Sequence, residues 1–351
     1  MLNRRFDAMI TARGMLIAAA AVAVGLAYPA PAAAECKLLQ VAEFQVDTNR
    51  NQVVFDGELN SQPIKVLIDT GAEISVIWRP AAARLGLKLS IVPRARMYGI
   101  GGESVVEAAY VSQLKLGNFT AKNWNLFVAG DIQGGFDMVL GQDFFSKHVV
   151  EFDLQHHAVR LFQPRGCRTE QLVYWSTTYS LADIDATALG SHRIETTVML
   201  NGKKVHAIVD SGAAMSIVTK FAAARAGVEA EGDKRESVQL INGFGRKSSE
   251  SWIGTFDSFA FGDESLRNAR LRIADLNQYN RTTSLGSRLE SAVEGTPDMM
   301  IGADFLMSHR MMIDVQERKI VFTYLGGKVF QTVHLDGSAA AAPAISESQP
   351  H

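Results

Sequence analysis

One tetrapeptide, aspartate followed by threonine or serine, glycine and alanine, occurs twice in this chain, at residues 69–72 and 210–213. Each copy follows an apolar run and opens a longer segment that matches the other at a constant separation of 141 residues, without a gap. The matched pairs include Leu59-Asn60 with Leu200-Asn201, Ser75 with Ser216, Ala81-Ala82-Ala83-Arg84 with Ala222-Ala223-Ala224-Arg225, and Gly86 with Gly227. Such a repeat predicts two copies of one structural unit, each with a carboxylate at the same place.

A second matched block lies further along each half, around Gly141 and Gly302, which are 161 residues apart. Residues 138–145 read Met-Val-Leu-Gly-Gln-Asp-Phe-Phe, and residues 299–306 read Met-Met-Ile-Gly-Ala-Asp-Phe-Leu. The separation grows because the second half contains extra polar sequence, mainly at residues 277–297. We expect that insertion to form a surface loop.

The local sequence indicates β-strands in both halves. Strand-forming runs at residues 53–55 and 64–68 flank a short turn, and runs at residues 194–200 and 205–209 flank Asn201-Gly202. Asn-Gly between two such runs is a strong signal of a β-hairpin. After each tetrapeptide, a further apolar run precedes a short alanine-rich helix ending near Gly86 or Gly227, where a helix C-terminus favours a left-handed residue. We therefore expect a mainly β protein.

The two aspartates, Asp69 and Asp210, are suited to acid–base chemistry as a pair. An aspartate after a buried strand, followed by a hydroxyl residue and glycine, places its carboxylate in a tight turn. Two such turns related by a pseudo-twofold axis bring both carboxyls to the interface between the halves. Like charges about 3 Å apart cannot both ionise, so the pair holds one proton. One member then acts as a base toward water and the other as an acid toward a carbonyl oxygen, with no metal ion and no cofactor.

With these residues in view, the chain resembles the aspartic proteases. The family pattern is a strand followed by Asp-[Thr/Ser]-Gly-Ala, a glycine-rich turn, and then two apolar residues and glycine before a short helix. Each half is similar to one retropepsin monomer, and the fused pair resembles the pepsin-like enzymes, over residues 42–163 and 194–325. The resemblance implies an all-β, two-lobed acid protease fold, in which each lobe is a retropepsin-like β-barrel with a short helix and the lobes are related by a pseudo-twofold axis.

The resemblance also implies roles for particular residues. Asp69 and Asp210 would be the catalytic dyad, and Gly141 and Gly302 would lie on loops packed behind it. The supporting residues would be Thr70 and Ser211, whose hydroxyls interlock across the lobe interface, with Gly71 and Gly212 in the tight turns. The glycine-rich turns would be substrate-binding flaps, formed by Tyr98, Gly99, Ile100 and Gly101 in the first half and by Gly243, Phe244 and Gly245 in the second. An ordinary hairpin turn is the alternative for Gly99, Gly101 and Gly102.

This sequence departs from the pepsin-like pattern at Ala72 and Ala213, where those enzymes usually have a hydroxyl residue. Losing a hydrogen bond to the carboxylate leaves its charged form less stabilised, so we predict a pH optimum above strongly acidic values. Glu73 adds a further charge near the dyad.

The N-terminal sequence predicts export, and the repeat divides the rest of the chain into two lobes. Arg4, Arg5 and Arg13 precede an apolar run at residues 15–26, and small residues follow, which is typical of a signal peptide over residues 1–34. We expect an N-terminal lobe at 35–166, an interlobe linker at 167–192, a C-terminal lobe at 193–335 and a disordered tail at 336–351. The protein would then be periplasmic or secreted, with no stable membrane insertion after cleavage.

Charge and cysteine content narrow the range of partners. The net charge is −2 and no basic stripe stands out, which disfavours nucleic acid as a partner. The two cysteines, Cys36 and Cys167, can form a disulfide in an exported chain, with two separate thiols as the alternative. Lipidation of Cys36 is disfavoured because Glu35 fits a lipidation signal poorly. No cluster of metal-ligand residues stands out, so we expect no metal.

Two functions fit this pattern. The first is an exported aspartic endopeptidase that hydrolyses polypeptides with water activated by Asp69 and Asp210, as a monomer whose lobes pair within one chain. The second is a peptide-binding or sensor protein of the same fold without turnover. The presence of both aspartates, each with its hydroxyl residue and glycine, favours the enzyme.

Overall fold

The computed structural model describes residues 36–99, 102–131, 135–186, 192–229, 236–242, 248–276, 281–283, 290–292 and 297–330. The predicted signal peptide and tail lie outside the described residues. So do five of the predicted flap residues, Ile100, Gly101, Gly243, Phe244 and Gly245.

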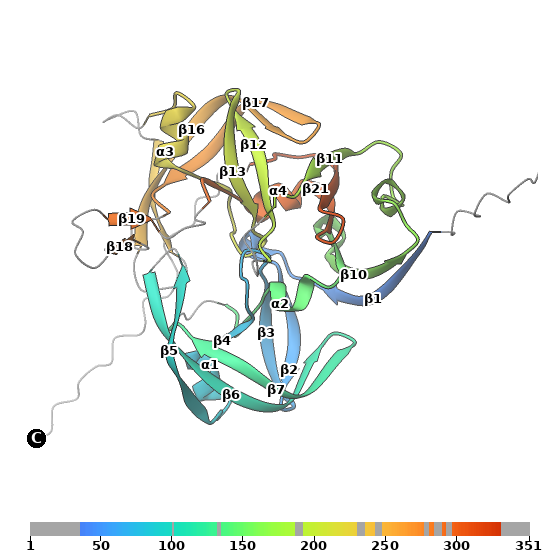
Figure 1. The fold of residues 1–351 in the computed structure, drawn as a ribbon, viewed down its shortest axis with the longest axis vertical. Helices are drawn as coiled ribbons and strands as arrows, with labels where there is room; N and C mark the ends of the chain where they lie inside the picture. The colour runs from blue at the N-terminus through green and yellow to red at the C-terminus, as the bar shows by residue number, and fades with distance from the viewer. Residues whose placement is uncertain are drawn as a thin grey trace, which may run out of the picture. The chain divides into compact units, whose positions relative to one another are not determined.

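The first repeat forms a closed β-barrel (Figure 1). Its strands pair in the order β2-β3-β8-β4-β7-β6-β5, and an additional pairing of β2 with β6 closes six of them into a ring. A 3-10 helix at Asn49–Asn51 precedes the barrel, and two short helices belong to it, α1 (Arg79–Arg84) and α2 (Gln142–Phe145). The strands are β2 (Val54–Leu59), β3 (Gln62–Ile68), β4 (Val76–Trp78), β5 (Leu89–Gly99), β6 (Gly102–Leu116), β7 (Phe119–Ala129) and β8 (Met138–Leu140).

The second repeat forms a barrel of the same topology. Its strand order is β12-β13-β20-β14-β17-β16-β15, and β12 pairs additionally with β16. The strands are β12 (Glu195–Leu200), β13 (Lys203–Val209), β14 (Ile217–Thr219), β15 (Glu236–Asn242), β16 (Ser248–Phe261), β17 (Glu264–Ala274) and β20 (Met299–Ile301). Its helices are α3 (Lys220–Arg225) and α4 (Ala303–Met307). Within the polar insertion, β18 (Arg281–Thr283) pairs with β19 (Glu290–Ala292) as a two-stranded sheet, where we had expected only a loop.

Turn chemistry fixes the hairpins in both barrels. Asn201 and Gly202 have φ values of 47° and 71°, and Asn60 and Ser61 have values of 49° and 64°. Two successive positive φ values match the right-handed twist of the flanking strands. The short helices end as expected, since Gly86 and Gly227 adopt φ values of 65° and 79°.

A third, six-stranded sheet joins the two repeats. Its order is β1-β10-β9-β21-β22-β11, so strands of the first half lie beside strands of the second. Phe152 of β9 pairs with Met311 of β21. The strands are β1 (Lys37–Gln45), β9 (Val149–Asp153), β10 (Ala158–Arg165), β11 (Ser180–Asp183), β21 (His309–Asp314) and β22 (Lys319–Tyr324). Two 3-10 helices, Leu154–His156 and Thr169–Leu172, connect these strands.

A disulfide between Cys36 and Cys167 links the start of β1 to the segment after β10, across 131 residues. Part of the predicted linker packs on the sheet, because β11 pairs with β22 and the Tyr174 hydroxyl donates to Glu151 at 2.8 Å. None of the helices in the described part of the chain has the length and apolar character that a membrane crossing requires.

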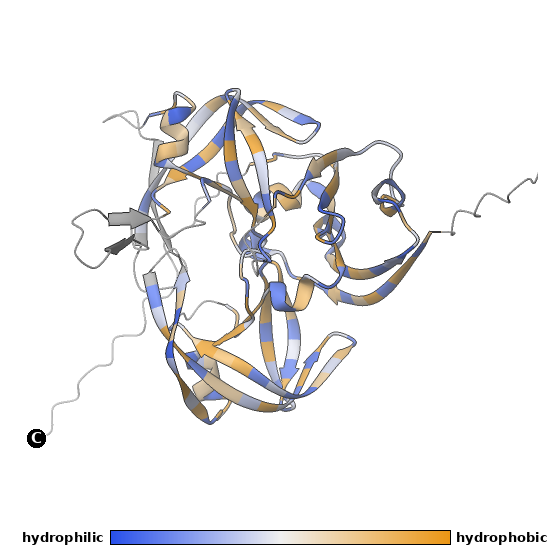
Figure 2. Cartoon of the chain, in the orientation of Figure 1, coloured by the Kyte–Doolittle hydropathy of each residue, from blue (hydrophilic) through white to orange (hydrophobic). Residues whose placement is uncertain are grey.

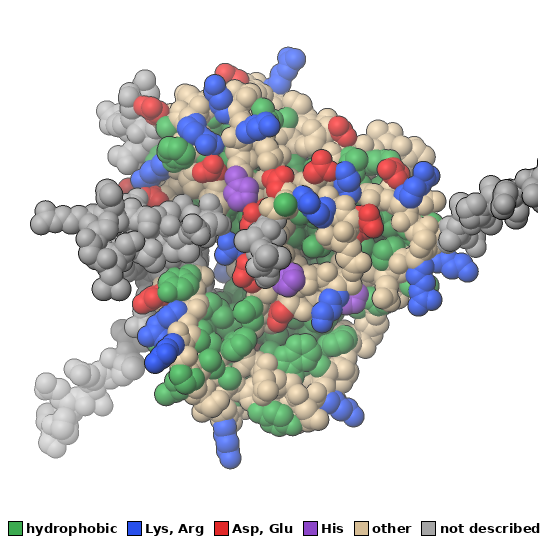
Figure 3. All heavy atoms as spheres, viewed as in Figure 1, with side chains coloured by type: hydrophobic (Ala, Val, Ile, Leu, Met, Phe, Trp, Pro, Cys, Tyr) green, Lys and Arg blue, Asp and Glu red, His purple; other side chains and the backbone are tan. Residues whose placement is uncertain are grey.

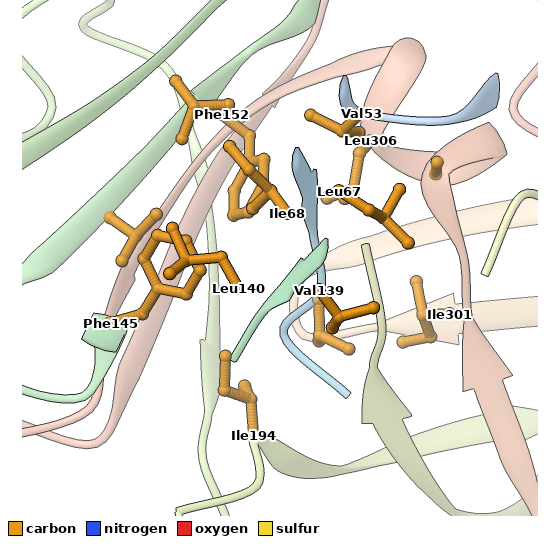
Figure 4. Packing of buried hydrophobic residues seen from close by; sticks show 14 of the residues in the cluster. Val53, Leu67, Ile68, Val139, Leu140, Phe145, Phe152, Ile194, Ile301 and Leu306 are labelled. Carbon is orange, nitrogen blue, oxygen red and sulfur yellow. The ribbon is translucent and has the colours of Figure 1, made fainter. Parts of the chain in front are cut away.

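Hydrophobic and hydrophilic residues alternate along the barrel strands, as expected for strands with one buried face (Figure 2). Most of the buried hydrophobic residues belong to one large cluster that runs through both barrels and the third sheet, and two smaller clusters lie beside it. Figure 4 shows part of it, including Ile68, Leu140 and Ile301, which end strands β3, β8 and β20. This core supports the turns that carry the two aspartates. The structure thus has the all-β, two-lobed fold that the resemblance to aspartic proteases implies, with one β-barrel in each lobe.

Candidate active site

Asp69 and Asp210 begin equivalent turns at the ends of β3 and β13. The backbone N–H of Asp69 donates to the Leu140 carbonyl at 3.0 Å, and that of Asp210 donates to the Ile301 carbonyl at 2.9 Å. Each aspartate is thereby tied to the short strand that runs parallel to its own strand, β8 or β20. The chain leaves the sheet directly after this bond, so the carboxylate sits in the turn.

Backbone amides hold each carboxylate in the same way. The Oδ1 atom of Asp69 accepts from the N–H groups of Gly71 and Ala72, at 2.9 and 3.0 Å. Asp210 Oδ1 accepts from Gly212 and Ala213, at 3.0 and 3.1 Å. These bonds orient the carboxyl groups and favour their charged forms.

The glycines that follow allow the two turns to meet. A Cβ atom on Gly71 would lie 2.5 Å from Cγ of Asp210, and one on Gly212 would lie 2.3 Å from Cγ of Asp69. Real Cβ atoms do not approach other atoms so closely, so any side chain at either position would collide with the opposite carboxyl group. The two carboxyls therefore face each other across the turns, as the repeat predicts.

The electrostatics of the pair favour a shared proton. Burial raises the pKa of Asp69 well above its usual value, and the neighbouring carboxyl of Asp210 raises it further. Burial also raises the pKa of Asp210, while bonds from Asp69 and the backbone amides oppose that effect. Because the two groups titrate together, the retained proton belongs to the pair.

Thr70 and Ser211 interlock below the dyad, with both side chains fully buried. The Thr70 hydroxyl donates to the Val209 carbonyl at 2.7 Å and accepts from the Ser211 N–H at 3.0 Å. Ser211 reciprocates, donating its hydroxyl to the Ile68 carbonyl at 2.8 Å and accepting from the Thr70 N–H at 3.1 Å. These four bonds join the two repeats at the dyad.

Matched serine–aspartate pairs support the turns from behind. The Ser75 hydroxyl donates to Asp143 at 2.6 Å and accepts from the Gly141 N–H, and the Ser216 hydroxyl does the same with Asp304, at 2.7 Å, and Gly302. A Cβ on Gly141 would lie 2.8 Å from the Ala72 carbonyl oxygen, so these glycines are required by close packing.

The surroundings of the dyad are not symmetric. Arg193 forms an ion pair with Glu73, with Nε 3.4 Å from Oε1, and its charge lowers the pKa of Asp210. Gln142 donates to the Thr70 carbonyl at 3.0 Å, whereas the matched residue of the second half is Ala303. The sequence analysis noted Glu73 but gave no role to Arg193, which lies outside the matched blocks, or to Gln142, which lies inside one but is matched by alanine in the second half.

The predicted flap of the first half is the end of a long hairpin. Strands β5 and β6 pair up to Gly99 and Gly102, and the Tyr98 side chain on β5 is about half exposed. In the second half β15 and β16 pair up to Asn242 and Ser248. Each hairpin therefore leads into one of the turns predicted to be flaps, and the tips of those turns lie outside the described residues. Within the described residues, no group of three or more His, Cys, Asp or Glu side chains lies close enough to hold a metal ion.

Comparison with protein families agrees with this geometry. The family model described as aspartyl protease matches residues 54–144 and 196–305, one region in each repeat and more than half of the chain together. This protein therefore belongs to the aspartyl protease family, as a retropepsin-like member with two repeats in one chain. A comparison with curated proteins found no match.

Proposed function

We propose that this protein is an exported aspartic endopeptidase that hydrolyses peptide bonds with water activated by Asp69 and Asp210. The proposal rests on the close approach of the Asp69 and Asp210 carboxyl groups. Each carboxyl accepts hydrogen bonds from two backbone amides of its own turn, and each lies against the glycine of the opposite turn. The raised pKa values of both carboxyls support a pair that retains one proton.

In this mechanism the ionised carboxyl takes a proton from water as the water oxygen attacks the peptide carbonyl carbon. The protonated carboxyl donates its proton to the carbonyl oxygen, which gives a neutral tetrahedral diol. Collapse of the diol breaks the C–N bond, and a proton passes from the dyad to the leaving nitrogen. The backbone amides of residues 71, 72, 212 and 213 keep both carboxyls in place throughout. The hairpins β5–β6 and β15–β16 would grip an extended substrate through strand-like hydrogen bonds.

Export is part of the proposal. The signal-like sequence of residues 1–34 and the Cys36–Cys167 disulfide support it, because disulfides persist mainly in oxidising compartments. N-terminal sequencing of the protein from fractionated cells tests this part, and a start near Glu35 outside the cytoplasm is the expected result.

The test of activity is cleavage of a mixed pool of unfolded proteins between pH 3 and 8. We expect cleavage by the wild type and its loss in both Asp69→Asn and Asp210→Asn. Asp56→Asn, which changes an exposed aspartate paired with Lys65, is the matched control and should cleave normally. A folded wild type that binds peptides but cleaves none at any pH would contradict the proposal and indicate a peptide-binding protein of the same fold.

A further inference from the structure

Each barrel presents a row of four side chains on the sheet face that carries the dyad. In the first lobe the strands align Leu67, Val139, Val76 and Phe127, and in the second they align Ile208, Met300, Ile217 and Arg272. Successive side chains of a strand alternate between faces, and Leu67 and Ile208 each stand two residues before a dyad aspartate. If the alternation is continued into the turn, both rows lie on the same side of their sheets as the carboxyls.

The two rows differ at their last member. Phe127 ends the row of the first lobe, on β7, and is 36% exposed. Other exposed hydrophobic residues lie on β5 and β6, and Figure 3 shows hydrophobic side chains gathered over this lobe. Arg272 takes this position in the second lobe and is 3% exposed. The first three members of both rows are apolar and buried, so the exchange of phenylalanine for arginine is the main chemical difference.

A second exchange accompanies the arginine. Ser251 in the second lobe and Val106 in the first occupy equivalent positions. Each stands two residues before the cross-strand partner of the last row member, which is Ile253 for Arg272 and Ala108 for Phe127. The Nη1 atom of Arg272 donates to the Ser251 hydroxyl at 2.9 Å. The second lobe thus replaces an apolar pair by a hydrogen-bonded polar pair at the same place.

The positive charge of Arg272 lacks a direct counter-charge among the described residues. Its Nε is buried there without a hydrogen-bond partner. The nearby charge of Asp304 opposes the lowering of the Arg272 pKa by burial, but the Asp304 carboxylate accepts its bonds from Ser216 and forms no ion pair with Arg272. A buried guanidinium stays protonated, and leaving its donors unpaired is unfavourable.

We propose that Arg272 gives the second lobe a preference for acidic substrates. The preferred aspartate or glutamate would be the substrate residue whose side chain contacts the row formed by Ile208, Met300, Ile217 and Arg272. This inference rests on the proposed function of the dyad. A carboxylate is the group that a guanidinium binds best, through its Nε edge in a planar, two-point contact. The first lobe, with Phe127 at the matched position, would select an apolar side chain on the other side of the scissile bond.

The test is mass-spectrometric profiling of the bonds cleaved in a peptide library by wild type, Arg272→Gln and Arg272→Lys. We expect acidic residues to be enriched at one position in the wild type, with kcat/KM for a glutamate peptide about tenfold or more above that of its glutamine counterpart. Arg272→Gln should abolish this ratio, because the charge that distinguishes the glutamate peptide from the glutamine peptide is gone. Arg272→Lys should keep part of it, because the charge remains.

A second variant tests the inference without disturbing Arg272. Phe127→Arg places the guanidinium at the matched position of the first lobe, and we expect it to create a new acidic preference on the opposite side of the scissile bond. Wild-type cleavage without any acidic preference, or a preference that survives in Arg272→Gln, would overturn the inference and leave the proposed hydrolysis standing. Absence of cleavage of every peptide would overturn both.

Discussion

The chemistry of the candidate site is determined residue by residue, and the least expected contributions come from outside the repeated motif. Each turn supplies two equivalent backbone N–H donors, yet Arg193 and Glu73 form an ion pair that has no matched counterpart among the motif residues. The dyad is therefore symmetric in its immediate bonds and asymmetric in the charges around it. Asymmetry of this kind favours one carboxyl over the other as the ionised partner.

The alanines after the dyad glycines lead to the first prediction. Ala72 and Ala213 contribute backbone N–H groups to the carboxylates but have no hydroxyl to donate. Replacing Ala213 by serine adds a donor that stabilises the charged form, so the pKa of the pair should fall and the acidic limb of the pH profile should move to lower pH. The measurement is kcat/KM between pH 2 and 8. A wild-type profile that already peaks below about pH 3, near the lower pepsin value, would contradict the argument.

Asp304 carries the second prediction. Burial raises its pKa from 3.8 to about 7, although Ser216 and Phe305 donate to its carboxylate. A carboxyl whose folded pKa is raised contributes stability that is fully present below the unfolded pKa, near 4, and is lost as pH rises through about 7. We therefore expect the free energy of unfolding to fall between about pH 4 and pH 7. Asp304→Asn should make this fall smaller, and the dyad, whose pKa values are also raised, should account for part of what remains. Denaturant titrations at several pH values measure this.

Asp143→Asn is the control for lost hydrogen bonds, because Asp143 makes the same contacts with Ser75 but is exposed. An Asp304→Asn protein whose stability varies with pH as steeply as that of the wild type would refute the assignment.

At the scale of elements, the interlocked turns after β3 and β13 make one unit from two repeats. Replacing Thr70 by alanine leaves the Val209 carbonyl and the Ser211 N–H without partners in a fully buried setting. Each unsatisfied group costs roughly 1–3 kcal/mol, so Thr70→Ala should lower the free energy of unfolding by a few kcal/mol and reduce activity as the dyad loosens. Thr70→Ser keeps the hydroxyl and should stay close to the wild type. Equal stability of the two variants would argue against the interlock.

Most elements around the site could be predicted from sequence because their signals are local. Asn201-Gly202 marks a hairpin by its own conformational preference, and Gly86 and Gly227 mark helix ends for the same reason. Gly71 and Gly212 were predicted as turn residues, but the structure adds a second reason, the close approach of the opposite carboxyl. That reason depends on a residue 139 or more positions away and cannot be read from a local pattern.

At the scale of the whole molecule, the six-stranded sheet was not predicted. Its central pairing joins Phe152 to Met311, and its outermost strand β11 comes from the segment between the repeats. The sequence analysis treated that segment as a linker with some packing, because strand partners so distant in sequence leave no local signal. The same limit explains why the sequence analysis assigned no role to Arg272. Its position beside Ile217, and its equivalence to Phe127 of the first lobe, follow only from the strand pairing in the structure.

This sheet holds a charged network that joins both halves around Glu151, which is fully buried. Its carboxylate accepts from Arg310 of the second half at 2.6 Å, from Arg160 of the first half at 3.3 Å and from the Tyr174 hydroxyl of the segment between them at 2.8 Å. Asp153 also contacts both arginines, at 3.5 and 3.1 Å. Glu151 is therefore the group on which three parts of the chain converge.

Replacing Glu151 by alanine would leave the largely buried guanidinium of Arg310 with Asp153, and that of Arg160 with Asp153 and the partly exposed Glu43. Removing one partner of a buried charge network typically costs about 3–5 kcal/mol, because the charges left behind stay desolvated. We expect Glu151→Ala to lower the free energy of unfolding by that amount, Glu151→Gln to fall between it and the wild type, and activity to follow the folded fraction. The exposed pair of Glu58 and Lys115 is the control, and Glu58→Ala should cost less than about 1 kcal/mol. Equal effects of Glu151→Ala and Glu58→Ala would mean that the network around Glu151 adds no more to stability than an exposed ion pair.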